Sequence, residues 1–254
     1  MELTTAWANY VKRLSNIDKA ATKRIGEFVD SIPGFDFGNP EHMAALVLEA
    51  FNVSDVYGEA AATLAAEMYD AVGLASGMFL DPAELAQTAT LSTVEQTVYG
   101  AAKHQSVKEV SQAVGRLVKK AGVDTVANNA KRDGSEVAWI PSGDTCAFCI
   151  TLASRGWQNA QYYVEHLHAN CDCTLGVRFN NSTKVKGYDP AKYEAMYYGA
   201  DLDGQKDTSK NRINALRREF YAKNKEEINA NKRMNYAERR ERLNSSEAEE
   251  INVN

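Results

Sequence analysis

Apolar residues recur at steps of three and four between residues 3 and 29, which is typical of one face of a long α-helix. Ile32-Pro33-Gly34 ends the pattern. We interpret this face as a packing surface and not as a cofactor site. The repeating positions are Leu3, Trp7, Tyr10, Val11, Leu14, Ile17, Ile25 and Phe28.

Further helices follow in the first half of the chain. Pro40 suits a first helical turn and opens a short second helix that ends near Phe51. An alanine-rich third helix is predicted over residues 56–72, where small side chains allow neighbouring helices to approach closely. Gly73 to Gly77 interrupts it, and Asp81-Pro82 predicts a new helix start.

Two capping-box patterns mark the next helix starts, Ser92 with Glu95 and Ser106 with Glu109. A separate short helix is predicted over residues 123–130, before Arg132-Asp133-Gly134 breaks it. Together these elements predict a helical bundle over residues 1–134.

After residue 134 the sequence pattern changes from helical to strand-like. Residues 137–140 and 174–179 are strand-like, and a short helix is predicted over residues 147–153 between them. We therefore expect a compact module over residues 135–180, whose two terminal strands pair, followed by a helical C-terminal arm over residues 181–254. The fold class is α+β, mostly α.

All four cysteines fall within this module. Cys146 and Cys149 form a C-x-x-C pattern, and Cys171 and Cys173 follow His168. A second close pair of cysteines provides the donors of a tetrahedral zinc site. One ion takes four donors, so the predicted ligands are the first three cysteines with either Cys173 or His168. His166 is a weaker candidate for a zinc ligand.

Other roles for these cysteines fit the sequence less well. Two disulfides need an oxidising compartment, and we find no secretory signal pattern. Reduced cysteines without metal remain an alternative. A redox dithiol does not need the second pair, and a zinc deaminase needs an H-x-E motif that the sequence does not contain.

Charge is distributed unevenly along the chain. Residues 205–242 hold twelve Lys or Arg against six Asp or Glu, a local charge of +6 that leaves −11 for the rest of a chain whose total is −5. A basic arm is thus attached to an acidic body. The chain has no apolar run that approaches a membrane span, so we expect no membrane contact and synthesis in the cytoplasm.

The cysteine block resembles the signature of phage Mu F-like head morphogenesis proteins, the minor capsid proteins of tailed phages. The similar parts are Cys146 to Gly156, a tyrosine-bearing loop and His168 to Thr174, with weaker similarity from Tyr57 to Arg240. The resemblance is closest to versions from phages of actinobacteria. It implies a structural virion protein inside the capsid that contacts portal, major capsid or scaffold protein, or packaged DNA.

Two residues depart from that family pattern, Ala169 and Asp172. Neither removes a ligand, but Asp172 would be repelled by phosphate. The arm offers two kinds of contact. Arg217, Arg218, Arg239 and Arg240 suit DNA, whereas an apolar stripe at Ile213, Leu216, Phe220 and Ile228 suits a protein partner, which we favour because the acidic body repels a duplex.

The competing class is an enzyme, a zinc-knuckle nuclease of the HNH kind. There His166 or His168 would activate water beside a metal, near Asp144, Glu165 or Asp172. The sequence has no further histidine near this group, so we expect no enzyme activity. A DNA-binding regulator would need a basic recognition helix, and residues 147–153 carry no charge.

Overall fold

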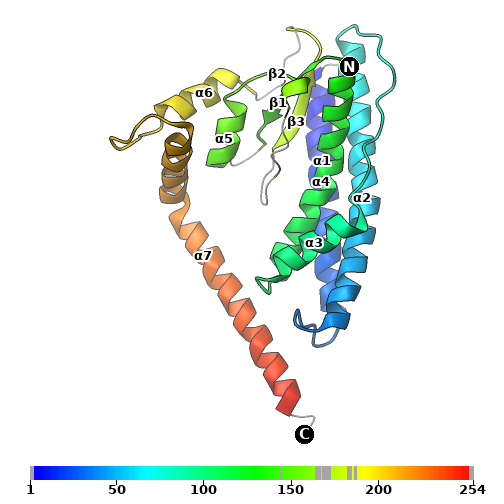
Figure 1. Cartoon of the computed structure of the whole chain (residues 1–254), viewed down its shortest axis with the longest axis vertical. Coiled ribbons are helices and arrows are strands. Elements are labelled where there is room, and N and C mark those ends of the chain that lie inside the picture. The colour runs from blue at the N-terminus through cyan, green and yellow to red at the C-terminus, as the bar shows by residue number, and fades with distance from the viewer. Residues whose placement is uncertain are drawn as a thin grey trace.

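The computed structural model describes residues 3–142, 145–163, 167, 173–181, 185 and 188–251. Long helices form a bundle, a small sheet and two short helices lie beside one end of it, and a last long helix starts next to these short helices and runs toward the other end of the bundle (Figure 1). The elements are α1 (Leu3–Asp30), α2 (Pro40–Ala75), α3 (Leu91–Ala102), α4 (Val107–Arg132), β1 (Glu136–Ile140), α5 (Ala147–Ala153), β2 (Gln158–Asn159), the 3-10 helix η1 (Ala160–Tyr162), β3 (Thr174–Arg178), α6 (Pro190–Gly199) and α7 (Ser209–Ile251).

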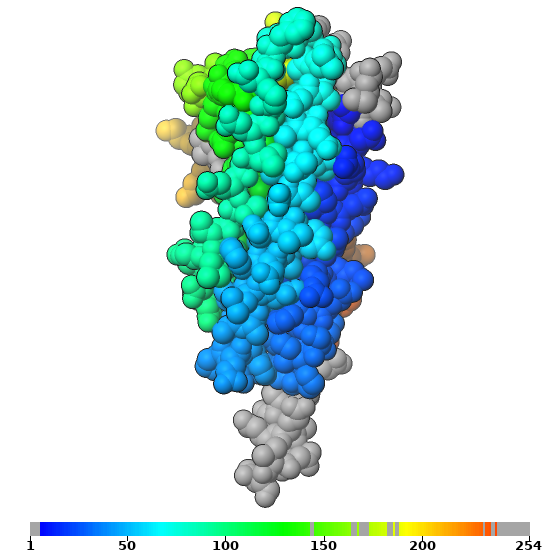
Figure 2. All heavy atoms as spheres, turned by 90° about the vertical axis from the view of Figure 1, so that its right-hand side faces the viewer, coloured from blue at the N-terminus to red at the C-terminus, as the bar shows by residue number. Residues whose placement is uncertain are grey.

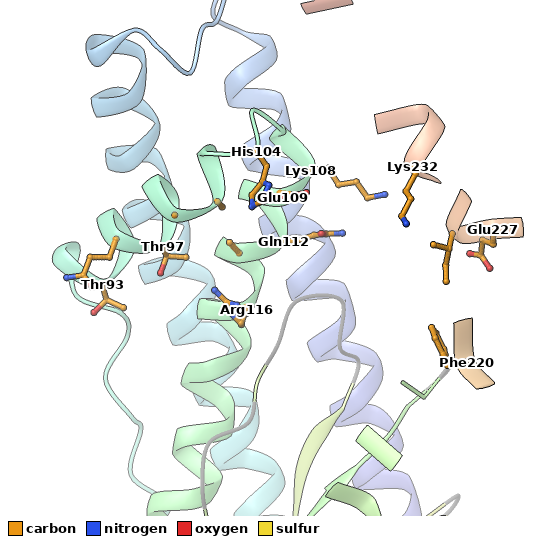
Figure 3. A pocket seen from close by; sticks show the side chains of 15 residues that line it. Thr93, Thr97, His104, Lys108, Glu109, Gln112, Arg116, Phe220, Glu227 and Lys232 are labelled. Atoms are coloured by element: carbon orange, nitrogen blue, oxygen red, sulfur yellow. Dashed lines mark ion pairs between the residues drawn. The ribbon is translucent and has the colours of Figure 1, made fainter. Parts of the chain in front are cut away.

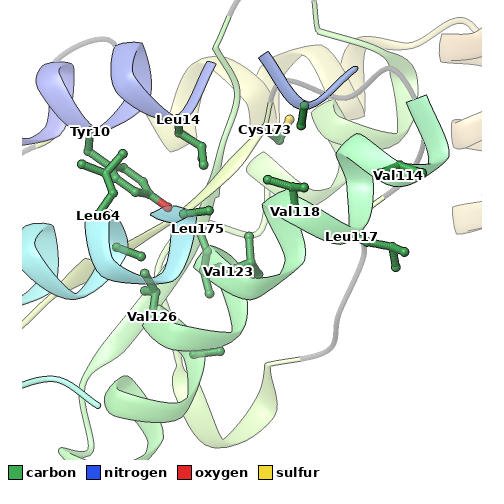
Figure 4. Packing of buried hydrophobic residues seen from close by; sticks show 14 of the residues in the cluster. Tyr10, Leu14, Leu64, Val114, Leu117, Val118, Val123, Val126, Cys173 and Leu175 are labelled. Carbon is green, nitrogen blue, oxygen red and sulfur yellow. The ribbon is translucent and has the colours of Figure 1, made fainter. Parts of the chain in front are cut away.

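The predicted first helix is confirmed as α1, and its apolar face is the part that is buried. Trp7, Tyr10, Leu14 and Ile25 contribute to one hydrophobic core with side chains of α2 and α4. Figure 4 shows Tyr10 and Leu14 of α1 among residues of these two helices and the sheet. None of the described helices is both long and apolar enough to cross a membrane.

The prediction of two helices over residues 40–72 was wrong, because α2 is one continuous helix. Asn39 caps it, accepting hydrogen bonds from the backbone N–H groups of Glu41 and His42. Residues 52–55 contain no Gly or Pro, and Val53 and Ser54 are buried there. The polar residues Asn52 and Asp55 in this stretch lie on the exposed side of α2 and do not interrupt the helix.

The helix start predicted at Asp81-Pro82 was also wrong. Residues 78–90 have no regular secondary structure and run along α2 and α4 toward α3. The N–H of Glu84 donates to Asn129 Oδ1 at 2.9 Å, and the N–H of Ala86 donates to Thr125 Oγ1 at 3.0 Å. Side chains of α4 thus satisfy backbone groups that a helix would otherwise pair.

Of the two helix starts predicted from capping boxes, one is confirmed. Ser106 Oγ accepts from the N–H of Glu109 at 3.3 Å and caps α4. The other helix, α3, begins two residues earlier than expected, because Thr90 and not Ser92 accepts from the N–H of Thr93. Both residues are good cap formers, so the pattern alone did not separate them.

The separate helix predicted over residues 123–130 is part of α4, which was therefore wrongly divided. Gly122 lies inside the helix at its closest approach to α2. A Cβ atom at this position would lie 3.1 Å from the carbonyl oxygen of Ala61. The glycine is kept for backbone contact between two helices and does not end either of them.

Both predicted strands and their pairing are confirmed. β1 and β3 are antiparallel, with Ile140 opposite Thr174, and the sheet order is β2-β1-β3. The short edge strand β2 was not predicted. The buried side of the sheet joins the core of the bundle, which extends from Trp7 to Val177 and includes Cys149 and Cys173. Residues 1–134 and 135–180 thus share one hydrophobic core, and their division into domains stays a prediction.

The C-terminal arm is helical, as predicted. The beginning of α7 packs on α5 and α6 through a small cluster of Ala147, Ala200, Ala215 and Leu216. The helix is kinked at Asn224, whose φ and ψ are −110° and 16°. Beyond this kink α7 runs away from the module and from α6 (Figure 1).

Candidate metal centre

The sheet register brings the two halves of the cysteine pattern to one end of the module. Ile140, the last residue of β1, pairs with Thr174, the first residue of β3. Cys173 directly precedes Thr174, and Cys146 follows Ile140 after a short connection. The first cysteine pair and Cys173 therefore leave the sheet from the same end.

Cys146 is the N-cap of α5. Its Sγ accepts a hydrogen bond from the backbone N–H of Cys149 at 3.4 Å, and its carbonyl oxygen accepts from the N–H of Ile150 at 3.0 Å. Cys149 is buried within the same helical turn. This local geometry holds the two sulfur atoms 3.4 Å apart.

The spacing of the Cys146 and Cys149 sulfurs can be compared with two chemical states. A disulfide requires a separation of about 2.05 Å, so these two cysteines are not bonded to each other. Two thiolates on one tetrahedral zinc ion, each about 2.3 Å from the metal, lie roughly 3.8 Å apart. The observed 3.4 Å is shorter than that and is the length of a hydrogen bond between two reduced thiols, so the spacing excludes a disulfide between these two cysteines and does not distinguish zinc ligands from metal-free thiols.

Tyr193 of α6 connects the first cysteine pair with Cys173. Burial raises the pKa of Tyr193, the nearby thiols of Cys173 and Cys149 raise it further, and a hydrogen bond with Thr145 acts in the opposite direction. One phenol thus lies near thiols from both halves of the pattern. A helix that the sequence analysis did not predict covers the site.

The remaining predicted ligands, His168 and Cys171, lie outside the described residues, as does His166. Within the part of the chain that the structure describes, no three or more His, Cys, Asp or Glu side chains gather as a metal-binding group. The donors brought together are Cys146 and Cys149, with Cys173 on the same side of the module. Zinc binding stays a prediction.

Aromatic residues attach α6 to the module. The Tyr188 hydroxyl donates to the carbonyl oxygen of Ala153 at 3.0 Å, and its ring lies 5.7 Å from that of Trp157. Arg178 at the end of β3 lies over the Trp157 ring and pairs with Glu136 of β1 at 2.7 Å. Burial also raises the pKa of Tyr188.

The start of α6 could have been predicted from the sequence. Asp189-Pro190 has the same form as Asn39-Pro40, and Asp189 Oδ1 accepts from the N–H of Ala191 at 3.1 Å. Read as a cap followed by a first-turn proline, the dipeptide predicts a helix start. Tyr193 would then have been a candidate for the surroundings of the metal.

The residues predicted for the arm have different surroundings. Arg217 and Arg218 are exposed, and Arg218 donates to the carbonyl oxygen of Asp201 at 3.1 Å. Leu216 is buried, whereas Ile213 and Phe220 are half-buried. Arg239 and Arg240 belong to α7, and their side chains are outside the described set, as are Asp144, Glu165 and Asp172 of the nuclease hypothesis.

The fold is a helical bundle that carries a small cysteine-containing α+β module. The chain belongs to the VG15 protein family, whose sequence model matches residues 1–200. This is a family of phage proteins, so the phage context predicted from the resemblance is confirmed. The matched region ends directly after α6 and does not include α7. No curated protein and no solved structure matches the chain.

Proposed function

We propose that this protein is a minor capsid protein of phage head morphogenesis that binds at or near the portal inside the procapsid. Membership of a phage family supports a phage role. The observation that carries the proposal is that the Cys146-x-x-Cys149 pair and Cys173 leave the same end of a small sheet. Its sequence pattern, completed by His168 and Cys171, resembles that of Mu F-like head proteins.

The module has a structural role in this proposal. Zinc would be held by Cys146, Cys149 and Cys171 with either Cys173 or His168, which closes the tetrahedron. Catalytic zinc sites keep one position open for water, whereas structural sites do not. We therefore expect no hydrolytic activity. Cleavage of DNA that needs a divalent metal and disappears in the His168→Ala protein would contradict this expectation.

The arm is proposed to bind a head protein, either portal, major capsid or scaffold protein, with packaged DNA as the weaker candidate. Exposed cations and exposed apolar side chains occur together on α7, for example Arg217 with Tyr221 and Met234. A protein partner uses both kinds of side chain. DNA would use only the cations and would be repelled by the acidic body.

Co-expression with the portal protein of the same phage tests the main proposal. We expect the chain to sediment with portal assemblies and to appear as additional density at the portal vertex of procapsids. Density for the chain only in the tail, or procapsids without it, would overturn the proposal. Major capsid protein expressed alone is the control for non-specific binding.

Two arm variants separate the candidate partners. Arg217→Glu with Arg218→Glu reverses exposed cations, and Tyr221→Ser with Met234→Ser removes exposed apolar groups. If the partner is a protein, the apolar variant lowers incorporation into procapsids. If the partner is DNA, only the charge variant lowers binding, and wild-type affinity falls steeply with salt. Leu216 is unsuitable for this test because it anchors α7 on α5 and α6.

A further inference from the structure

One long stretch of the chain carries carboxylates without any cation. Residues 25–102 contain twelve Asp or Glu and no Lys or Arg. The stretch includes all of α2, the extended segment 78–90 and α3. Because most protein surfaces mix both signs of charge, a surface of this kind favours a cationic partner.

The outward side of α2 between Glu41 and Leu74, with the adjoining segment 78–90, is here named the acidic face. Apolar side chains stand exposed among its carboxylates: Val56 is 64% exposed, Leu74 76% and Phe79 fully. Figure 2 views the molecule from this side, with α2 along its middle. Val56 and Leu74 are 18 residues, about five helical turns, apart on one side of α2, so the middle and the C-terminal end of this side each expose an apolar group among carboxylates.

Cations from α1 reach only the edge of the acidic face. Arg13 pairs with Glu67 at 3.1 Å, and Arg24 pairs with Glu49 at 2.6 Å. Among the ion pairs of the described residues, none involves Glu59, which is exposed near the middle of α2. The centre of the face, around Val56 and Glu59, therefore keeps its negative charge.

A groove of about 930 Å³ lies between α7 and the α3–α4 pair (Figure 3). Its lining combines cations with apolar side chains, and includes Lys108, Arg116, Lys232, Phe220 and Ile228. Glu109 and Glu227 also line it, but the Glu109 carboxylate lies 3.7 Å from His104 Nε2. Cations outnumber carboxylates in this groove, which is named the basic groove.

The basic groove has the dimensions of a helix. Its volume corresponds to roughly two turns of a helix about 10 Å wide. In the two turns of α2 around Val56 and Glu59, the exposed side chains are those of Asp55, Val56, Glu59 and Ala60. The two carboxylates suit Lys108, Arg116 and Lys232 of the groove, and Val56 suits Phe220 and Ile228. Helices commonly dock in this manner, with apolar residues in the groove and charges at its rim.

We propose that the acidic face of one copy of this protein docks in the basic groove of a second copy. The two surfaces lie on opposite sides of the molecule, since α2 and α7 flank it in Figure 1. One chain therefore cannot close the contact on itself. A contact between two different surfaces joins copies head to tail, into a ring or an open filament. This inference does not depend on the proposed place at the portal.

Sedimentation of the purified full chain tests the proposal. A face variant, Val56→Lys with Glu59→Lys, and a groove variant, Lys108→Glu with Lys232→Glu, change exposed residues only. We expect the wild type to associate at low salt and to dissociate as salt screens the charges. Each variant should weaken association by at least about tenfold and sediment as a 28.0 kDa monomer.

Mixing the two variants gives the sharpest result. The face variant keeps an intact groove, and the groove variant keeps an intact face. Head-to-tail docking therefore predicts that the mixture forms a dimer of twice 28.0 kDa and nothing larger. The control, Glu194→Lys with Met196→Lys on exposed positions of α6, has the same charge change as the face variant and should associate like the wild type.

Three results would overturn the proposal. The first is a wild type that stays monomeric at about 100 µM, well above the Kd of a weak specific complex. The second is association that both variants retain. The third is a mixture of the two variants that stays monomeric although the wild type associates. A wild type that is monomeric but captures a basic helix of another head protein would also contradict it, by assigning the acidic face to that partner.

Discussion

The helical bundle buries large side chains from three long helices, whereas the cysteine module consists of two five-residue strands and a seven-residue helix. In the bundle, Tyr10, Leu46 and Tyr69 have no more than 1% of their surface exposed. In the module, Trp139 and Leu175 join the same core, and the thiols of Cys146 and Cys149 lie 3.4 Å apart. Burial accounts for the order of the first region, and we propose that the second depends in addition on a metal held by its cysteines.

This difference predicts different responses to mutation. A loss of apolar volume in the bundle should lower the stability of the whole shared core. A loss of one sulfur should instead act on the module, because a metal site stabilises only the elements that supply its ligands. The two regions share one hydrophobic core. The residues at which the loss of protection stops therefore show how far the module unfolds independently of the bundle.

The largest effect is expected for Cys149→Ser. We predict that the module unfolds locally, with loss of hydrogen-exchange protection in β1 and β3, while α1 and α2 keep their protection. The matched control is Thr151→Val, which alters a buried residue of the same helix without changing a sulfur. Unchanged exchange in β1 and β3 would contradict a metal-supported module.

Leu46→Ala should have the next largest effect. Leu46 is fully buried in α2, and truncation of a buried leucine costs about 2–5 kcal/mol through lost transfer energy and the cavity that remains. Urea unfolding should show one cooperative transition at lower denaturant concentration. Leu48→Ala, two residues away and 57% exposed, should stay within about 0.5 kcal/mol of the wild type.

Asn129→Ala tests the segment 78–90 that runs along α2 and α4. The Asn129 amide accepts from the N–H of Glu84 and donates to its carbonyl oxygen at 2.8 Å. Its removal leaves backbone groups of a partly buried segment unpaired, at a cost of about 1–3 kcal/mol. Proteolysis within residues 78–90 should become faster, and a rate equal to that of the wild type would show that these hydrogen bonds do not hold the segment.

The smallest effect concerns acid stability. A hydrogen bond from Arg132, the largest cause, lowers the pKa of Asp133 below its ordinary value of 3.8, and a hydrogen bond from Tyr69 acts in the same direction. Because the folded-state pKa is the lower one, this stabilisation is present above about pH 4 and is lost as pH falls through the folded value.

In Asp133→Asn we expect the melting temperature to fall by about 2 °C at pH 7, with the difference from the wild type shrinking below pH 4. Thermal unfolding at several pH values measures this. A difference that grows as the pH falls would contradict the sign of the pKa change.

The sequence predicted the elements whose apolar pattern is unbroken, such as α1 and the strands β1 and β3. It failed where tertiary contacts decide the outcome. A separate helix was predicted from residue 123, but Gly122 lies inside α4 and allows this helix to touch the backbone of α2. Asp81-Pro82 carries a helix-start pattern, yet Asn129 and Thr125, more than 35 residues away, bind the following backbone in an extended form.

For the candidate site, the register of β1 and β3 places Cys146, Cys149 and Cys173 at one end of the sheet, whereas Cys171 and His168 lie outside the described residues, so the predicted ligand set stays a prediction. Tyr193 could not be assigned to that site from spacing, because it comes from α6, beyond the second cysteine pair. The acidic face could not be predicted from the sequence either. Leu48, Val56 and Leu74 look like core residues in the sequence, and only the packing of α2 shows that they are exposed.

Zinc content is the most direct test of the difference between bundle and module. Full-length protein purified under reducing conditions without chelator should contain about one zinc per chain, and X-ray absorption should show sulfur ligands at about 2.3 Å. Cys146→Ser protein prepared in parallel should lose the metal. Wild-type protein without zinc, or with sulfur neighbours at about 2.05 Å as in a disulfide, would contradict a module supported by metal.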